Sequence, residues 1–179
     1  LDLACAIATG RDWHGHKVKQ GPVVILAGEG QNGIARRLTA WERDRGVSLA
    51  EGPIYISHRA EPLDQGVSAV LDALEPIKPV AVFVDTLNRH MHGDENSAKE
   101  TGAFIRSLDA IRLKYQCLVA TLHHSGHAEK DRARGSTAIK GSMDAEIGVS
   151  MAGGADLGSL PVVTVTNSKQ KDNPHEKPL

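Results

Sequence analysis

Aromatic side chains are scarce in this sequence of 179 residues, with two Trp, two Tyr and two Phe making up 3% of the chain. A hydrophobic core must therefore be built from Val, Ile, Leu and Ala. Hydrophobic residues nevertheless reach 40% and charged residues 24%, which are ordinary proportions for a globular protein of this length. We expect residues 1–179 to form one domain.

The sequence also has few cysteines, a net charge near zero and no apolar run long enough to cross a membrane. The two cysteines, Cys5 and Cys117, both stand in apolar segments, which predicts buried thiols in a reducing compartment such as the cytoplasm. A formal net charge of −1 gives no overall attraction for nucleic acid, so any contact with DNA must come from local loops. No segment is long and apolar enough to span a membrane, and no secretory signal is present.

Apolar runs and helical periodicities alternate along the chain. Three continuous apolar runs predict strands buried on both faces of a sheet, at residues 22–27, 80–84 and 117–122. Shorter strands are predicted at residues 53–57, 145–151 and 162–166. The spacing of apolar residues predicts helices over residues 1–9, 33–45 and 63–74. A further helix begins at Ser97, which fits a capping box with Glu100.

This alternation predicts an α/β fold, with a mostly parallel sheet and helices on both of its faces. In such sheets, ligands bind at the carboxyl ends of the strands. Several polar residues of this sequence directly follow the predicted strands, and they are therefore the candidates for chemistry.

Two acidic residues end predicted strands. Asp85 follows the apolar run VAVFV, as in the Walker B arrangement, where an Asp holds Mg²⁺ directly or through water. Glu29 ends the run PVVILAG, where a second carboxylate could orient and deprotonate a water for attack on a γ-phosphate. Each residue alone could equally be an ordinary turn residue. Two acidic strand ends in one sheet are more informative than either one.

Two histidines, His123 and His124, end the third apolar run. A polar residue at this place could contact a γ-phosphate and report its hydrolysis to the loop that follows, although a strand-end histidine bonded to backbone is the ordinary alternative. Metal binding is a further alternative because His127 is nearby. The run HHSGH lacks the i, i+4 spacing of a zinc peptidase, and no cysteine cluster accompanies it, which disfavours a metal.

The segment GEGQNG at residues 28–33 is a G-x-G-x-x-G motif between a predicted strand and a predicted helix, as in dinucleotide-binding sites. The next strand ends in His58 and Arg59, which would suit the 2′-phosphate of NADP. However, Glu29 would place an anion against the pyrophosphate, where the site needs donors. An NADP-binding Rossmann-type oxidoreductase is therefore an alternative that Glu29 disfavours.

Basic residues are concentrated in two segments near the C-terminus. Residues 129–142 form a basic segment that includes Lys130, Arg132 and Arg134. A flexible basic loop can follow a phosphate backbone, but the segment has no aromatic residue to stack on bases, and charge alone favours a solvated surface loop. Lys169 and Lys171 follow the last predicted strand, and their i, i+2 spacing directs both side chains to the same side.

Five segments, taken together and in this order, resemble the ATPase domain of RepA-type hexameric helicases of plasmids and phages. These helicases are relatives of the DnaB class within the RecA-like superfamily of P-loop ATPases. The matching segments are ILAGEGQNGIARRL, VFVDTLNRHMHGDENSAKETGAFI, LVATLHHSGH, RARGSTAIKGSMDAEI and VTNSKQKD. The resemblance implies a RecA-like core with ATP and Mg²⁺ as cofactors. It implies single-stranded DNA and further copies of the chain, in a ring that is typically hexameric, as partners in DNA replication.

The resemblance also implies roles for individual residues. Glu29 matches the catalytic glutamate, and Asp85 matches the Walker B aspartate that holds Mg²⁺ through water. His123, accompanied by His124, matches the γ-phosphate sensor. The segment with Lys130, Arg132 and Arg134 matches the loop that faces DNA in the central channel of the ring. The pair Lys169 and Lys171 matches basic residues that insert into the neighbouring subunit's site.

The sequence departs from the family pattern in three ways. The phosphate-binding motif G-x-x-x-x-G-K-[ST] occurs nowhere in it, so we expect this motif upstream of Leu1 and expect these residues alone to bind ATP poorly. The strand that feeds the motif is also absent, which predicts a gap in the sheet or the need for a partner chain. Lys171 stands where relatives often have Arg, and lysine cannot make the bidentate contacts of an arginine finger. A non-catalytic nucleic-acid-binding or assembly module is therefore a third interpretation.

Overall fold

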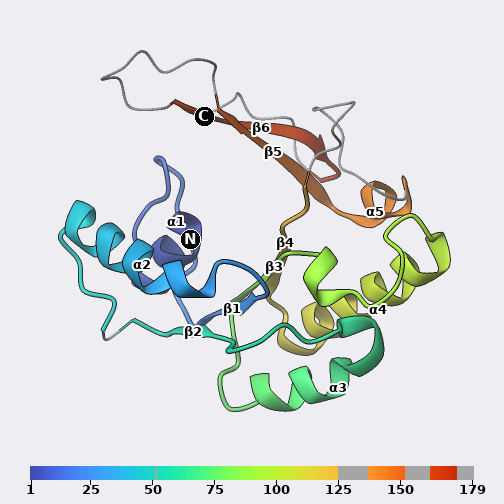
Figure 1. Ribbon diagram of the computed structural model, residues 1–179. Coiled ribbons are helices and arrows are strands. Elements are labelled where there is room, and N and C mark those ends of the chain that lie inside the picture. Colours follow the sequence, from blue (N-terminus) through green and yellow to red (C-terminus); the bar gives the residue numbers. More distant parts are fainter. Residues whose placement is uncertain (51, 125–136, 152–161, 173–179) are drawn as a thin grey trace.

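The computed structural model describes residues 1–50, 52–124, 137–151 and 162–172 (Figure 1). It contains a four-stranded sheet with helices packed against it and a separate two-stranded sheet. The helices are α1 (Asp2–Thr9), α2 (Gln31–Arg45), α3 (Leu63–Leu74), the short 3₁₀-helix η1 (Asn88–His90), α4 (Ala98–Tyr115) and α5 (Thr137–Ser142). The strands are β1 (Val23–Ala27), β2 (Ile54–Ile56), β3 (Ala81–Asp85), β4 (Leu118–Thr121), β5 (Ala145–Met151) and β6 (Val163–Gln170).

The four-stranded sheet has the order β2-β1-β3-β4, and all of its neighbouring strands are parallel. Strand β1 is central, with Val23 opposite Ile54 on one side and Ala81 on the other. The predicted α/β fold, with a parallel sheet flanked by helices, is therefore confirmed.

Both faces of the sheet are covered, which explains the continuous apolar runs. Val24 and Leu26 of β1 belong to a core cluster that includes buried residues of α3 and α4. Val23, Ile25 and Ala27, on the opposite face, belong to a second cluster with buried residues of α1 and α2. Every residue of β1 is thus buried, as predicted for a strand between two helical layers.

Strand β4 departs from the prediction of burial on both faces. It is the outer strand of the sheet next to β3. Its first residue, Leu118, and the residue that directly follows it, Leu122, have exposed fractions of 47% and 45%. The predicted gap in the sheet is also wrong for the described strands, because each of the four is hydrogen-bonded to its neighbour.

The two C-terminal strands do not join the parallel sheet. Strands β5 and β6 pair with each other in an antiparallel sheet of their own. The physical reason is visible in the sequence AEIGVSM, which alternates apolar with small or polar residues. Such a strand can cover one face only, and Ile147, Val149 and Met151 are exposed on β5.

The helix ends follow the sequence signals, with two differences. Helix α2 begins at Gln31, two residues before its predicted start, directly after Gly30 in the left-handed conformation at φ 61°. At the start of α4, Ser97 Oγ accepts a hydrogen bond from the Glu100 amide at 3.4 Å, as predicted. The reciprocal half of the capping box is not formed, because the Glu100 carboxylate instead accepts a hydrogen bond from the amide of Asp94.

Two further predictions concern the thiols and membrane segments. Cys5 and Cys117 are free and buried, as predicted. Within the described ranges, the structure contains no helix of the length and apolar character needed to cross a membrane.

Candidate functional site

The carboxyl edge of the sheet contains a topological switch point between β1 and β3. From β1 the chain continues through α2 to β2 on one side, whereas from β3 it continues through α4 to β4 on the other. The core clusters place α2 and α4 on opposite faces of the sheet. The loops after β1 and β3 therefore diverge, and a crevice between two such loops is where open α/β sheets bind ligands.

The two predicted acidic residues meet at this switch point. Ala27 and Asp85 are register partners in the β1–β3 pair, and Glu29 follows two residues after Ala27. The hydroxyl of Thr86, the residue after Asp85, donates a hydrogen bond to Glu29 Oε1 at 3.1 Å. The structure thus brings together the carboxylates that the sequence places 56 positions apart (85 − 29).

At the switch point, the negative charge of Glu29 acts on the carboxyl group of Asp85. Burial, followed by the negative charge of Glu29, raises the pKa of Asp85 above its ordinary value. The positive charges of Arg37 and His90 oppose this effect and are outweighed. A carboxyl group in this state gains most from a cation or a proton, so Asp85 is suited to a metal ligand role.

A buried histidine supports the segment after Asp85. His90 is fully buried, and its Nδ1 lies 3.0 Å from the carbonyl oxygen of Thr86. Because a carbonyl can only accept, Nδ1 carries the proton in this contact. Burial lowers the pKa of His90 and outweighs the opposite effects of Thr86, Asp85 and Glu61, so the ring is neutral near pH 7. His90 therefore fixes the backbone from which Thr86 reaches Glu29.

Arg89 is a site residue that the sequence analysis missed. Its Nε lies 3.7 Å from Glu29 Oε1, the same carboxylate oxygen that accepts the hydrogen bond from Thr86. Glycine at position 28 allows Arg89 to lie this close to the end of β1, because a Cβ at Gly28 would clash with the Cβ of Arg89 at 2.5 Å. A glycine directly after a buried strand was the signal in the sequence that another chain segment passes close by.

His123 lies two residues beyond the end of the neighbouring strand β4 and has an unpredicted partner. Its Nε2 is 3.4 Å from Glu95 Oε2, and the two side chains are only 10% and 17% exposed. The amide of Leu87 donates to the carbonyl of Leu122 at 2.8 Å, which ties the end of β4 to the segment after Asp85. His123 therefore lies at the same edge of the sheet as the carboxylates, whereas His124 is exposed beside it.

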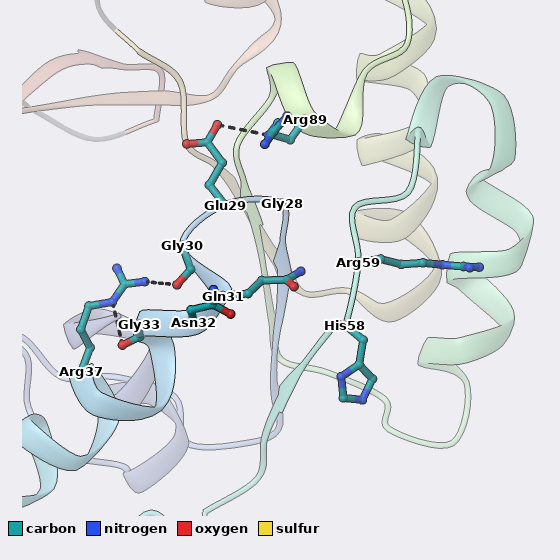
Figure 2. A pocket seen from close by; sticks show the side chains of 10 residues that line it. All are labelled: Gly28, Glu29, Gly30, Gln31, Asn32, Gly33, Arg37, His58, Arg59 and Arg89. Atoms are coloured by element: carbon teal, nitrogen blue, oxygen red, sulfur yellow. Dashed lines mark hydrogen bonds and ion pairs between the residues drawn. The ribbon is translucent and has the colours of Figure 1, made fainter.

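The β1–α2 loop forms one wall of a cavity of about 640 Å³ (Figure 2). Gly28 to Gly33 line it together with Arg37, and His58, Arg59 and Arg89 complete the lining. The predicted strand–loop–helix context of the G-x-G-x-x-G segment is thus confirmed. Figure 2 shows the Glu29 side chain directed towards Arg89 and away from the start of α2.

The predicted pair Lys169 and Lys171 has intramolecular partners. Lys169 belongs to β6, not to the segment after the last strand as predicted, because β6 continues to Gln170. Its ammonium group donates to the carbonyls of Lys140 and Gly141, the latter at 3.1 Å. Lys171 pairs with Asp144 at 3.0 Å, so both side chains do point to the same side.

Two further predictions concern contacts with DNA and the binding of a metal. The predicted DNA-contacting residues lie outside the described part of the chain, and they are Lys130, Arg132 and Arg134. Among the described residues, no group of three or more His, Cys, Asp or Glu side chains is arranged as a metal site. A magnesium ion at Asp85 would therefore take its other oxygen ligands from Thr86, water or a bound phosphate.

The model of the AAA domain family matches residues 1–130, which is 130 of the 179 residues. The chain belongs to the AAA domain family. AAA domains are nucleotide-binding ATPase domains, so membership favours the ATPase interpretation over the dinucleotide-binding one. The matched part of this AAA domain includes Glu29, Asp85, His123 and His124, and it ends before Lys169 and Lys171. No curated protein sequence matches the chain.

Proposed function

We propose that this AAA domain is the ATP-hydrolysing motor of a RepA-like DNA helicase that acts in the replication of a plasmid, phage or mobile element. The observation that carries the proposal is the pairing of Ala27 with Asp85, which sets Glu29 and Thr86 3.1 Å apart at the switch point of the sheet. Two carboxylates at a ligand-binding edge are what hydrolysis of a phosphoanhydride requires, one for water and one for a metal.

Glu29 is the proposed general base. Its carboxylate would accept a proton from a water molecule and orient that water towards a γ-phosphate. Thr86 and Arg89 both contact Oε1, which leaves Oε2 for the water. These contacts restrict the carboxylate before the substrate arrives, and such preorganisation is what lowers the barrier in phosphoryl transfer.

Asp85 is the proposed ligand of Mg²⁺, directly or through water. The fit is good because carboxylate and hydroxyl oxygens are the ligands that Mg²⁺ prefers, and Thr86 adds a hydroxyl next to Asp85. When bound, Mg²⁺ would neutralise charge on the phosphates. The chain contains no G-x-x-x-x-G-K-[ST] motif, so the residues described here supply the base and the metal ligand, and not the Lys that holds the β- and γ-phosphates.

The remaining roles follow the same proposal. His123, held by Glu95, would contact the γ-phosphate, with His124 beside it at the start of the DNA-facing loop. Lys130, Arg132 and Arg134 of that loop would follow the phosphates of single-stranded DNA. In a homo-oligomeric ring, Lys169 and Lys171 would exchange their contacts with Gly141 and Asp144 for a neighbour's nucleotide.

The decisive experiment measures ATP turnover and ATP binding by the full-length protein with Glu29→Gln. Turnover should fall by at least about 100-fold, with ATP affinity unchanged, because the amide cannot accept the proton of water. Single-stranded DNA should stimulate the unchanged protein. Glu75→Gln is the matched control, since Glu75 directly follows α3, away from the carboxyl edge, and is exposed. Turnover that survives Glu29→Gln would contradict the assigned mechanism.

Calorimetry separates the proposal from the oxidoreductase alternative. The full-length protein should bind ADP with Mg²⁺ and should not bind NADPH. Tight NADPH binding that is lost on substitution of Arg59 would instead favour the dinucleotide interpretation of residues 28–33. ADP binding without turnover in the unchanged protein would favour the non-catalytic assembly module.

A further inference from the structure

Strand β1 leads to Glu29, and its two neighbouring strands stop pairing with it at different points. Strand β3 pairs with β1 from Val23 to Ala27, whereas β2 pairs with it only from Val23 to Ile25. Ala27 has no exposed surface, so its backbone groups need partners within the protein. Its carbonyl accepts a hydrogen bond from Gln31 Nε2 at 2.7 Å. Its amide lies beyond the last residue that pairs with β2 and needs a different partner.

The side chain of Ser57 is the partner of this amide. Ser57 directly follows β2, and its own amide donates to the carbonyl of Ile25 at 2.9 Å. In a regular parallel ladder, the backbone carbonyl of the same residue would accept the next hydrogen bond from β1. Here Ser57 Oγ accepts that hydrogen bond from the Ala27 amide, at 2.8 Å. A hydroxyl group thus extends the pairing between the two strands by one step.

The hydroxyl of Ser57 is itself held in one orientation. Its Oγ donates to the carbonyl of Arg59 at 3.1 Å. A serine hydroxyl has a single proton, and a carbonyl can only accept, so this contact uses the proton and leaves the lone pairs of Oγ for Ala27. The acceptor that holds the Ala27 amide is therefore fixed before any substrate binds.

Two consecutive amides before Glu29 are held from opposite sides of β1. The Ala27 amide donates to Ser57 on the side of β2, and the Gly28 amide donates to the carbonyl of Asp85 on the side of β3. Glu29 is the next residue along the chain. The position of its backbone relative to Asp85 therefore depends on both contacts, and Ser57 makes the one that does not come from β3.

We propose that Ser57 is a positioning residue for Glu29, which it places by holding the backbone of Ala27. This role rests on the proposed function, in which Glu29 is the general base. Thr86 restrains the carboxylate of Glu29 and Ser57 restrains the backbone that leads to it, so the two contacts act on different parts of the same residue. Without the hydroxyl, the buried Ala27 amide would lack its acceptor, and the segment would shift to find another. A misplacement of about 1 Å can slow a reaction by about 100-fold.

The test measures kcat and KM of ATP hydrolysis by the full-length protein with Ser57→Ala and with Ser57→Thr. Ser57→Ala should lower kcat by at least about tenfold and leave KM within about twofold, because the base is displaced and the nucleotide contacts are not. Ser57→Thr keeps the hydroxyl and should keep most of kcat. Ser48→Ala is the matched control, since Ser48 Oγ also accepts a backbone amide, that of Ala50 at 3.1 Å, but at an exposed position after α2. Its kcat should stay unchanged, and an equal loss in Ser48→Ala and Ser57→Ala would overturn the proposal.

Hydrogen exchange of the Ala27 amide, measured by NMR on the same variants, gives a readout that needs no hydrolysis. Exchange should be at least about tenfold faster in Ser57→Ala and unchanged in Ser57→Thr. Unchanged exchange in Ser57→Ala would overturn the proposal, whether or not the protein hydrolyses ATP. If Glu29→Gln abolishes turnover but Ser57→Ala lowers only the unfolding midpoint and not kcat, Ser57 has a structural role alone and does not position Glu29. Turnover that survives Glu29→Gln would instead contradict the proposed function.

Discussion

The carboxylate of Asp2 and the indole of Trp41 lie 2.7 Å apart, between Oδ1 and Nε1, and this hydrogen bond joins α1 to α2. The same carboxylate accepts from the indole of Trp13 at 2.8 Å through Oδ2. Both tryptophans of the sequence therefore converge on one acidic side chain. This contact fixes the helical layer on the side of the sheet that α1 and α2 cover.

Asp2→Asn should lower the free energy of unfolding of the chain by about 1 kcal/mol at pH 7, because an amide cannot accept from both indoles. This value is small because solvent partly screens the contact, since the Asp2 side chain is 40% exposed. Intrinsic tryptophan fluorescence during urea denaturation measures it. Asp72→Asn, at an exposed position of α3, is the control and should leave the unfolding midpoint unchanged.

The same contact makes stability depend on pH in the acid range. Burial alone would raise the pKa of Asp2, but the donors Trp41 and Trp13, with Arg45 and His14, outweigh burial and hold this pKa below its ordinary value. A lowered folded-state pKa stabilises the protein above the unfolded value, and this contribution disappears as the pH falls through the folded value. The difference in stability between the unchanged chain and Asp2→Asn should therefore shrink below about pH 4. A constant difference from pH 7 to pH 3 would contradict this account.

Thr86→Val should reduce kcat of ATP hydrolysis by about tenfold in the full-length protein, with a small change in KM. The valine preserves the shape of the side chain but removes the hydroxyl that donates to Glu29, and a hydrogen bond to a charged group is worth about 1.5–3 kcal/mol. Thr86→Ser keeps the hydroxyl and should retain most of the activity. Steady-state kinetics of the two variants measure kcat and KM. Equal activity in both variants would mean that Thr86 does not position Glu29.

Glu95→Gln should act through His123. The two side chains are mostly buried and 3.4 Å apart, so the carboxylate orients the imidazole that we propose for the γ-phosphate. Turnover by Glu95→Gln, His123→Ala and the double variant should be non-additive, with a coupling energy of at least about 0.5 kcal/mol. The cycle of Glu75→Gln with His123→Ala should be additive. Additive effects in both cycles would mean that Glu95 does not act through His123.

Phe104→Ala should destabilise the chain by about 3–5 kcal/mol, because Phe104 is fully buried between α4 and the sheet and its removal leaves a cavity. Leu113→Ala on the same helix is the control, since Leu113 is 57% exposed and should cost less than about 0.5 kcal/mol. Urea denaturation followed by circular dichroism measures both. Similar losses in the two variants would mean that the burial assigned to α4 is wrong.

The sequence by itself determined the elements of the main sheet and the residues at its carboxyl edge. The apolar runs at β1 and β3 could be identified because a strand covered on both faces needs no polar residue, and α3 was predicted with its observed bounds. Glu29 and Asp85 could be singled out because each interrupts such a run. The cap at Ser97 was visible for a similar reason, since its side chain bonds within one turn.

Only the tertiary structure decided which of these residues meet. Arg89, Glu95 and the lining of the cavity come from loops whose sequences have no period, so nothing local indicates their partners. The separation of β5 and β6 from the parallel sheet was decided in the same way, because an alternating strand fits any half-covered sheet. Contacts between residues far apart in sequence depend on strand order, and strand order is set by how the whole chain packs its two core clusters, not by the local pattern of any one segment.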